Sequence, residues 1–206
     1  MIENIYWLGH ASFKIVEKGK VIYIDPWKIK KPEEADIILV THSHYDHFSP
    51  EDIKVLQGDR TIIVSTRNVI KQCSGNKKEL LPGQKINIED VGIEGVVSYN
   101  INKKFHPKED NNLGFIITID KIKIYHAGDT DFIPEMKELK VDIALLPVSG
   151  TYVMNPSEAV DAGKTMKPKI AIPMHYGSIV GSIKDAEDFK KGLEGIVKVV
   201  IKDVEE

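Results

Sequence analysis

The chain has 206 residues, of which 42% are hydrophobic and 29% charged, a balance typical of a globular protein with a buried core. Its formal net charge of −3 predicts no global attraction to nucleic acid or to an anionic membrane surface. The one cysteine, Cys73, excludes an internal disulfide and a cysteine-based zinc site, and we interpret it as a spectator thiol at a helix end. The sequence shows neither a signal peptide nor a run long enough to span a membrane, so we expect a cytoplasmic protein with a single domain over residues 1–206.

Short apolar runs predict strands in the first part of the chain. The predicted strands are 5–8, 12–16, 21–24 and 37–40, with a hairpin turn at 17–20. After the fourth run, Ser49 and Pro50 predict the start of a helix. Ser49 fits the N-cap, Pro50 the first helical position, and Asp52 the acidic position of a capping box.

The remaining chain returns to strands and then alternates strand with helix. The predicted strands are 61–65, 85–88, 92–98, 114–119, 122–126, 142–147, 170–174 and 197–201. Asn155 to Glu158 predicts a second helix start, and a last helix is predicted near 184–193. Small side chains at helical spacing, including Ala159 and Gly163, predict a face that packs closely on a sheet. This order fits two sheets with helices outside them.

Three of the seven histidines and one aspartate lie within six positions, directly after the apolar run 37–40. On extended backbone, residues i and i+2 project from the same side, so His42 and His44 can face one ion. Asp46 and His47 follow where the chain turns and can supply a carboxylate and an imidazole to a second ion. The alternative is a solvated loop rich in histidine, which four metal-capable side chains at a strand end make the weaker interpretation.

Two more metal-capable side chains end other apolar runs. Asp129 follows the run 122–126 closely, after Gly128, and a carboxylate there can span two cations and offset their repulsion. His175 ends the run 170–174. Considered alone, a turn aspartate and a buried core histidine are serious alternatives at these two positions.

Together these segments resemble the metallo-β-lactamase fold superfamily over essentially the whole chain. The segment 42–47 matches its His-X-His-X-Asp-His motif. Segment 125–130 looks like the one whose aspartate bridges the two metals, and 173–177 like the one with the final histidine ligand. Segments 7–13 and 24–26 look like the opening hairpin of one branch. That branch holds small metal-dependent hydrolases and is similar to ascorbate-6-phosphate lactonases and N-acyl-phosphatidylethanolamine phospholipases.

The resemblance implies an α/β (α+β) fold, a four-layer αββα sandwich of two mixed β-sheets flanked by helices. It also implies a metal-dependent hydrolase that cleaves an ester, lactone or phosphodiester-type bond in a small substrate. A hydroxide held between two divalent ions would be the nucleophile, and Asp46 would orient it or take its proton. Zinc is the expected metal, with manganese and iron as alternatives. The implied ligands are His42, His44, Asp46, His47, His106, Asp129 and His175.

One ligand position is open. In the family a third histidine for the first metal lies about midway between the motif and the bridging aspartate. Only His106 lies in that interval, whereas Asn100 stands at the strand end where many relatives would place the histidine. We expect His106 to be the ligand, because neutral imidazole binds zinc better than an amide. The alternative is Asn100 as a weaker ligand, with His106 lining the pocket.

Several other residues are expected behind the ligands or along the pocket. These are His10, Asp25, His126 and Tyr176. For His126 a purely structural histidine is an equally good interpretation. Three lysines near His106 are consistent with an anionic substrate or, more commonly, with a solvated loop.

Two other classes of function stay open at this point. Some members of the superfamily hold iron and act on oxygen or sulfur species, although His44 argues against the di-iron flavoprotein type, which has a carboxylate there. A metal-stabilised binding protein without catalytic activity is the second alternative, because fold and function are separate claims.

Overall fold

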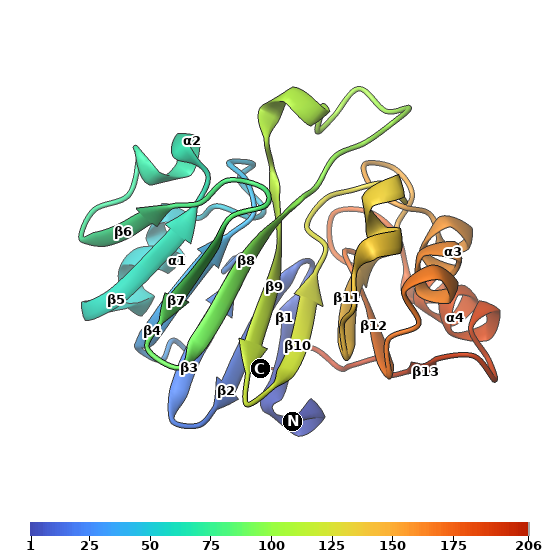
Figure 1. Cartoon of the computed structure of the whole chain (residues 1–206), viewed down its shortest axis with the longest axis horizontal. Coiled ribbons are helices and arrows are strands. Elements are labelled where there is room, and N and C mark those ends of the chain that lie inside the picture. The colour runs from blue at the N-terminus through green and yellow to red at the C-terminus, as the bar shows by residue number, and fades with distance from the viewer. Residues whose placement is uncertain (206) are drawn as a thin grey trace. The chain divides into compact units, whose positions relative to one another are not determined.

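The structure is a computed structural model that describes residues 1–205, and Glu206 lies outside the described residues (Figure 1). The chain divides into two compact units. Unit 1 comprises Met1–Leu80 with the C-terminal residues from Lys202, and unit 2 comprises Leu81–Ile201. The single domain expected over residues 1–206 stays a prediction.

Unit 1 contains a six-stranded mixed sheet in the order β1-β2-β3-β4-β5-β6. After a short 3-10 helix, η1 (Ile2–Asn4), its strands are β1 (Ile5–Gly9), β2 (Ser12–Glu17), β3 (Lys20–Ile24), β4 (Ala35–Val40), β5 (Gln57–Ser65) and β6 (Asn76–Glu79). The first three strands pair antiparallel, and β3 to β6 pair parallel. Because β3 and β4 are parallel neighbours, their carboxyl ends lie at the same edge, where Asp25 and Thr41 follow them.

Two helices belong to unit 1, α1 (Pro50–Leu56) and α2 (Arg67–Ile70). The predicted N-cap is confirmed, because Ser49 Oγ accepts a hydrogen bond from Asp52 N at 3.2 Å. The predicted capping box is wrong. The Asp52 carboxylate instead accepts from Lys28 N at 2.8 Å and Ile29 N at 2.9 Å, and so ties the loop after β3 to the helix.

The two helices pack on the sheet of unit 1 through a buried apolar cluster. The cluster comprises Tyr23, Ala35, Ile38, Val40, Phe48, Ile53, Leu56, Ile63 and Val69. Burying each large side chain of this kind stabilises the fold by about 1.5–3 kcal/mol relative to leaving it exposed. Since Val40 and Phe48 are both members, the cluster anchors the two ends of the histidine-rich loop.

Unit 2 contains a seven-stranded mixed sheet in the order β13-β12-β11-β10-β9-β8-β7. Its strands are β7 (Lys85–Ile88), β8 (Val91–Val97), β9 (Leu113–Ile119), β10 (Ile122–His126), β11 (Ile143–Pro147), β12 (Ile170–Met174) and β13 (Lys198–Val199). The strands β7 to β10 form an antiparallel meander, and β10 to β13 pair parallel. The carboxyl ends of β10, β11 and β12 therefore share one edge, and Asp129, Ser149 and His175 follow there.

Two helices, α3 (Pro156–Met166) and α4 (Ile183–Gly192), lie beside β11 and β12 (Figure 1). The predicted start of α3 is confirmed as a capping box, in which Asn155 and Glu158 each accept the other's backbone N–H. The small face of α3 has a different close neighbour from the one we expected. A Cβ on Gly163 would lie 2.8 Å from Leu193 Cδ1, so this glycine admits the end of α4 rather than the sheet.

The predicted fold class, two mixed sheets with flanking helices, is confirmed. The elements not predicted from the sequence are α2, β6, η1 and two further short 3-10 helices, η2 (Lys108–Asp110) and η3 (Pro134–Glu138). Among residues 1–205, none of the helices is long and apolar enough to cross a membrane.

Candidate metal centre

The histidine-rich motif lies in the loop after β4, where the chain bends. His47 N and Phe48 N both donate to His44 O, at 3.0 and 2.8 Å. His42 Nε2 lies 3.0 Å from His44 Nδ1, so the two rings lie close enough to face one ion, which stays a prediction. The expected extended backbone is wrong, since β4 ends at Val40 and the bent loop brings the rings together. His42 is buried, whereas His44 is exposed.

Asp25 lies directly after β3 and is fully buried. Its Oδ1 accepts from Thr41 N at 2.7 Å, and its Oδ2 lies 2.7 Å from both Thr41 Oγ1 and His47 Nδ1. Thr41 Oγ1 is also 2.9 Å from His42 Nδ1. The backbone of Asp25 is left-handed, with φ of +47°, a conformation that aspartate tolerates better than most residues. Asp25 therefore orients one motif histidine directly and the other through Thr41.

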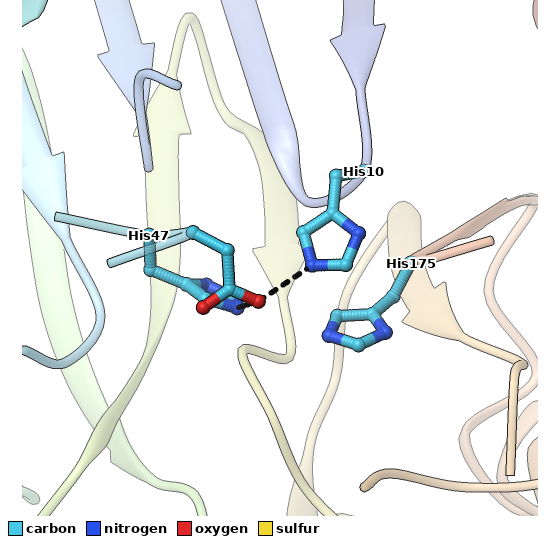
Figure 2. Close-up of side chains that lie close together, drawn as sticks. His10, His47 and His175 are labelled. Carbon is cyan, nitrogen blue, oxygen red and sulfur yellow. Dashed lines mark hydrogen bonds and ion pairs between the residues drawn. The ribbon is translucent and has the colours of Figure 1, made fainter. Parts of the chain in front are cut away.

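His10 lies between β1 and β2 and is fully buried. Its Nε2 is 2.9 Å from Asp46 Oδ2, the dashed contact of Figure 2. Because an ionised carboxylate only accepts hydrogen bonds, His10 donates Nε2–H to Asp46. The Trp7 indole Nε1 donates to His10 O at 2.9 Å and holds this residue at a left-handed φ of +52°. His10, Asp46 and His47 each place one metal-capable atom within 4.8 Å of the other two.

Asp129 collects two histidines of unit 2. Its Oδ2 lies 3.5 Å from His106 Nε2 and 3.2 Å from His175 Nε2, and all three side chains are buried. Gly128, with φ of +64°, makes the turn between β10 and Asp129. Two imidazoles from segments far apart in the sequence thus meet at one carboxylate.

His175 follows β12 with a left-handed φ of +61° (Figure 2). Its Nδ1 lies 3.0 Å from the hydroxyl of Ser149, the residue that follows β11 by two positions. Ser149 and Thr41 were not predicted from the sequence as partners of the histidines. The available signal was their position, since Thr41 directly precedes His42, and Ser149 follows β11, a parallel neighbour of the strand that leads to His175.

His106 and Asn100 have different roles in the loop between β8 and β9. The Asn100 amide nitrogen donates to Phe105 O at 2.9 Å and Tyr152 O at 2.7 Å, and it lies 3.2 Å from His106 Nδ1. Asn100 N also donates to His106 O at 2.9 Å. Asn100 therefore shapes the loop behind the His106 ring, while His106 Nε2 faces Asp129. This geometry favours His106 as the ligand, which stays a prediction.

The lysines of this loop are largely neutralised. Lys103 forms an ion pair with the buried carboxylate of Asp131. Lys108 Nζ donates to Glu135 Oε1 at 2.7 Å, and this hydrogen bond raises the pKa of the Lys108 ammonium. The carboxylates fix the loop, and the interpretation that these lysines attract an anionic substrate loses support, with Lys104 the remaining lysine of the three.

His126 and Tyr176 lie next to motif residues and are buried. His126 Nδ1 accepts a hydrogen bond from Gly128 N at 3.2 Å, which stabilises the turn that leads to Asp129. This contact agrees with the structural interpretation of His126. A role for Tyr176 along the pocket stays a prediction.

Comparisons with known proteins agree with this fold. Residues 4–175 match a family model described as a β-lactamase superfamily domain. A UPF0173 metal-dependent hydrolase of Thermoplasma acidophilum is 34% identical over 219 residues, which cover 98% of this chain and 96% of that protein.

Two solved structures share the fold at high coverage. A protein from Parabacteroides distasonis superposes with a TM-score of 0.87 at 35% identity, over 98% of this chain and 93% of its own. Igni18, a metallo hydrolase from Ignicoccus hospitalis, superposes with a TM-score of 0.83 at 25% identity, over 98% of this chain and 95% of its own.

Proposed function

The chain belongs to the metallo-β-lactamase superfamily, and from this premise we propose that it is a metal-dependent hydrolase with a dinuclear site. The substrate is a small molecule with an ester, lactone or phosphodiester-type bond. The proposed ligands are His42, His44, Asp46 and His47 of unit 1, and His106, Asp129 and His175 of unit 2. The closer likeness to lactonases and phospholipases stays a prediction.

The donor set fits divalent ions. Imidazole nitrogens and carboxylate oxygens suit zinc, and also manganese and iron, and thiolate ligands are absent from both clusters as far as residues 1–205 show. In unit 1, metal-capable atoms of Asp46 and His47 lie within 4.8 Å of each other. Two ligands of one ion are typically separated by such short distances, because each binds at about 2 Å.

The position of Asp129 is the observation that carries the proposal. One oxygen of this carboxylate lies within 3.5 Å of a nitrogen of His106 and also of His175. We assign these two histidines to different ions. A carboxylate shared between them is suitably placed to bridge two cations and to offset their mutual repulsion.

The side chains of the protein position the reacting water and the substrate. Two bound ions would supply Lewis acidity and lower the pKa of bound water to about 7. His10 holds Asp46 by Oδ2, and we assign acceptance of the water's proton to Asp46 Oδ1. The exposed ring of Phe105 packs edge-on against the Tyr152 ring, with 4.9 Å between the ring centroids. It offers an apolar surface next to His106 for the non-reacting part of the substrate.

Metal content tests the dinuclear site. We expect close to two metal equivalents per purified chain, and the double variant His42→Ala with His44→Ala should lose at least one. Glu187→Ala with Lys191→Ala is the control, because this double variant removes two exposed side chains of α4 outside the proposed ligand set and should retain both equivalents. Metal-free protein that is folded and fully active would contradict the proposal.

A substrate screen tests the reaction. Metal-defined protein should be assayed with phosphodiesters, lactones, thioesters and β-lactams, and at least one class should be hydrolysed. No hydrolysis of any of these classes, together with oxygen consumption supported by bound iron, would favour the redox alternative. Stabilisation by a ligand without turnover would favour a binding protein.

A further inference from the structure

We propose that Asp25, acting directly and through Thr41, couples the two metal sites by fixing which ring nitrogen is protonated in one histidine ligand of each. The inference rests on the proposed function for one step, the assignment of His42 and His47 to different ions. All of the contacts involved lie within unit 1.

The direct contact is between Asp25 and His47. An ionised carboxylate has only acceptor sites, and Asp25 Oδ2 lies 2.7 Å from His47 Nδ1. His47 must therefore carry its hydrogen on Nδ1. In a neutral imidazole the other nitrogen, Nε2, then has the lone pair that a metal ion requires.

The relayed contact passes through the hydroxyl of Thr41. This group has one hydrogen, and Asp25 Oδ2 receives it at 2.7 Å. At its other contacts, with His42 Nδ1 at 2.9 Å and His47 Nδ1 at 3.4 Å, Thr41 Oγ1 can then only accept. His42 therefore also carries its hydrogen on Nδ1. Its unprotonated Nε2 is the nitrogen that lies 3.0 Å from His44 Nδ1.

Burial isolates this hydrogen-bond network from solvent. Asp25, Thr41 and His47 are fully buried, and His42 is 2% exposed, so bulk water cannot easily replace a missing partner. The backbone is fixed as well, because Asp25 N donates to Leu39 O at 2.9 Å and Thr41 N donates to Asp25 Oδ1 at 2.7 Å. The Thr41 N contact alone would anchor the loop. The second carboxylate oxygen is therefore left to orient the two rings.

Three substitutions separate this role from simple loop anchoring. Thr41→Val removes the relay at nearly constant volume and should weaken one zinc equivalent about 10–100-fold, with the other unchanged. Asp25→Asn presents an amide N–H to His47, favours the wrong tautomer and should weaken both equivalents by a similar factor. Thr41→Ser keeps the hydroxyl and should bind both equivalents as the wild type does.

Zinc affinity is measured by chelator competition, and folding by thermal unfolding of the metal-free protein. The tautomers are read separately, by long-range ¹H–¹⁵N correlation of the imidazole rings in the metal-free wild type. We expect Nδ1–H in both His42 and His47. An Nε2–H tautomer in either ring, or equal weakening of both equivalents in Thr41→Val, would overturn the coupling.

The outcomes distinguish this inference from the proposed function. Nδ1–H tautomers in a wild type that binds no zinc would refute the metal site and not the hydrogen-bond relay. Two zinc equivalents with the wrong tautomers would refute the relay and leave the metal site standing. If Asp25→Asn does not fold, zinc binding by Thr41→Val and the tautomers of the wild type still test the proposed coupling.

Discussion

We predict that a side chain at Gly114 in β9 would destabilise the sheet and displace the backbone segment that leads to Asp129. A Cβ at this position would lie 2.9 Å from His126 O and 3.0 Å from Ala127 O. These are backbone atoms, and Ala127 N is itself bonded to Leu145 O at 3.1 Å, so they cannot yield without disturbing the sheet. Overpacking of this kind costs about 1–3 kcal/mol, which we expect for Gly114→Ala.

Gly92 in β8 provides the matched control, because it faces Thr118 of the same strand β9. A Cβ on Gly92 would have its nearest neighbours, Asn87 Oδ1 and Thr118 Cβ, at 3.4 Å. The added methyl group fits there with little adjustment, and the loss of glycine's freedom in the unfolded chain should stabilise Gly92→Ala by about 0.4–1 kcal/mol. The two variants should therefore differ by about 1.4–4 kcal/mol.

Thermal and urea unfolding of the metal-free variants measure this difference. At about 2–4 °C per kcal/mol for a chain of this size, Gly114→Ala should lower Tm by about 2–12 °C. Its metal affinity should fall too, because the displaced backbone at Ala127 leads directly to Asp129. A Gly114→Ala variant as stable as the wild type would refute the reasoning. Equal destabilisation by Gly92→Ala would show that the close contact is not the cause.

Three further predictions concern single side chains. In steady-state assays, His10→Ala should lower kcat about 10–100-fold. His10→Gln should lower kcat much less, because glutamine keeps a hydrogen-bond donor for the Asp46 carboxylate. Equal losses in the two variants would contradict a positioning role for His10. The backbone N–H of Lys123 and the ammonium of Lys169 hold the pKa of Asp142 below its usual value. Ionised Asp142 thus contributes stability above the unfolded carboxylate pKa that is lost as pH falls through the lower folded pKa, and D142N should flatten the acid limb of urea unfolding below about pH 4. Burial raises the pKa of the Cys73 thiol, so iodoacetamide should label it far more slowly in the folded than in the urea-unfolded protein, and rapid labelling would contradict a spectator role.

The apolar runs and helix caps made most of the fold predictable. The strands 85–88, 122–126 and 170–174 were predicted to the residue, because turn signals bound each apolar run. By contrast, β6 has the sequence Asn-Lys-Lys-Glu with every residue exposed. It is a strand only because it pairs with β5, and no local pattern indicates that pairing.

Only those site residues could be predicted whose type and spacing along the sequence form a recognisable motif. The motif histidines and Asp129 have such a signature. Thr41 and Ser149 do not, because a hydroxyl that orients an imidazole depends on which strands are parallel neighbours. Asp52 is the opposite case, because its spacing from Ser49 predicts a capping box. Its carboxylate instead accepts hydrogen bonds from backbone N–H groups of the loop after β3.

Four of the proposed functional residues occupy a backbone conformation that glycine would adopt at lower cost. His10, Asp25, His106 and His175 have φ values of +52°, +47°, +57° and +61°. Each left-handed residue with a side chain costs about 1 kcal/mol or more. Selection for stability alone would favour glycine at these positions, so the chain trades folding free energy for the side chains that the site requires. Variants found in a screen for thermostability should therefore include glycine at these four positions, and those variants should have lower metal affinity or lower activity than the wild type.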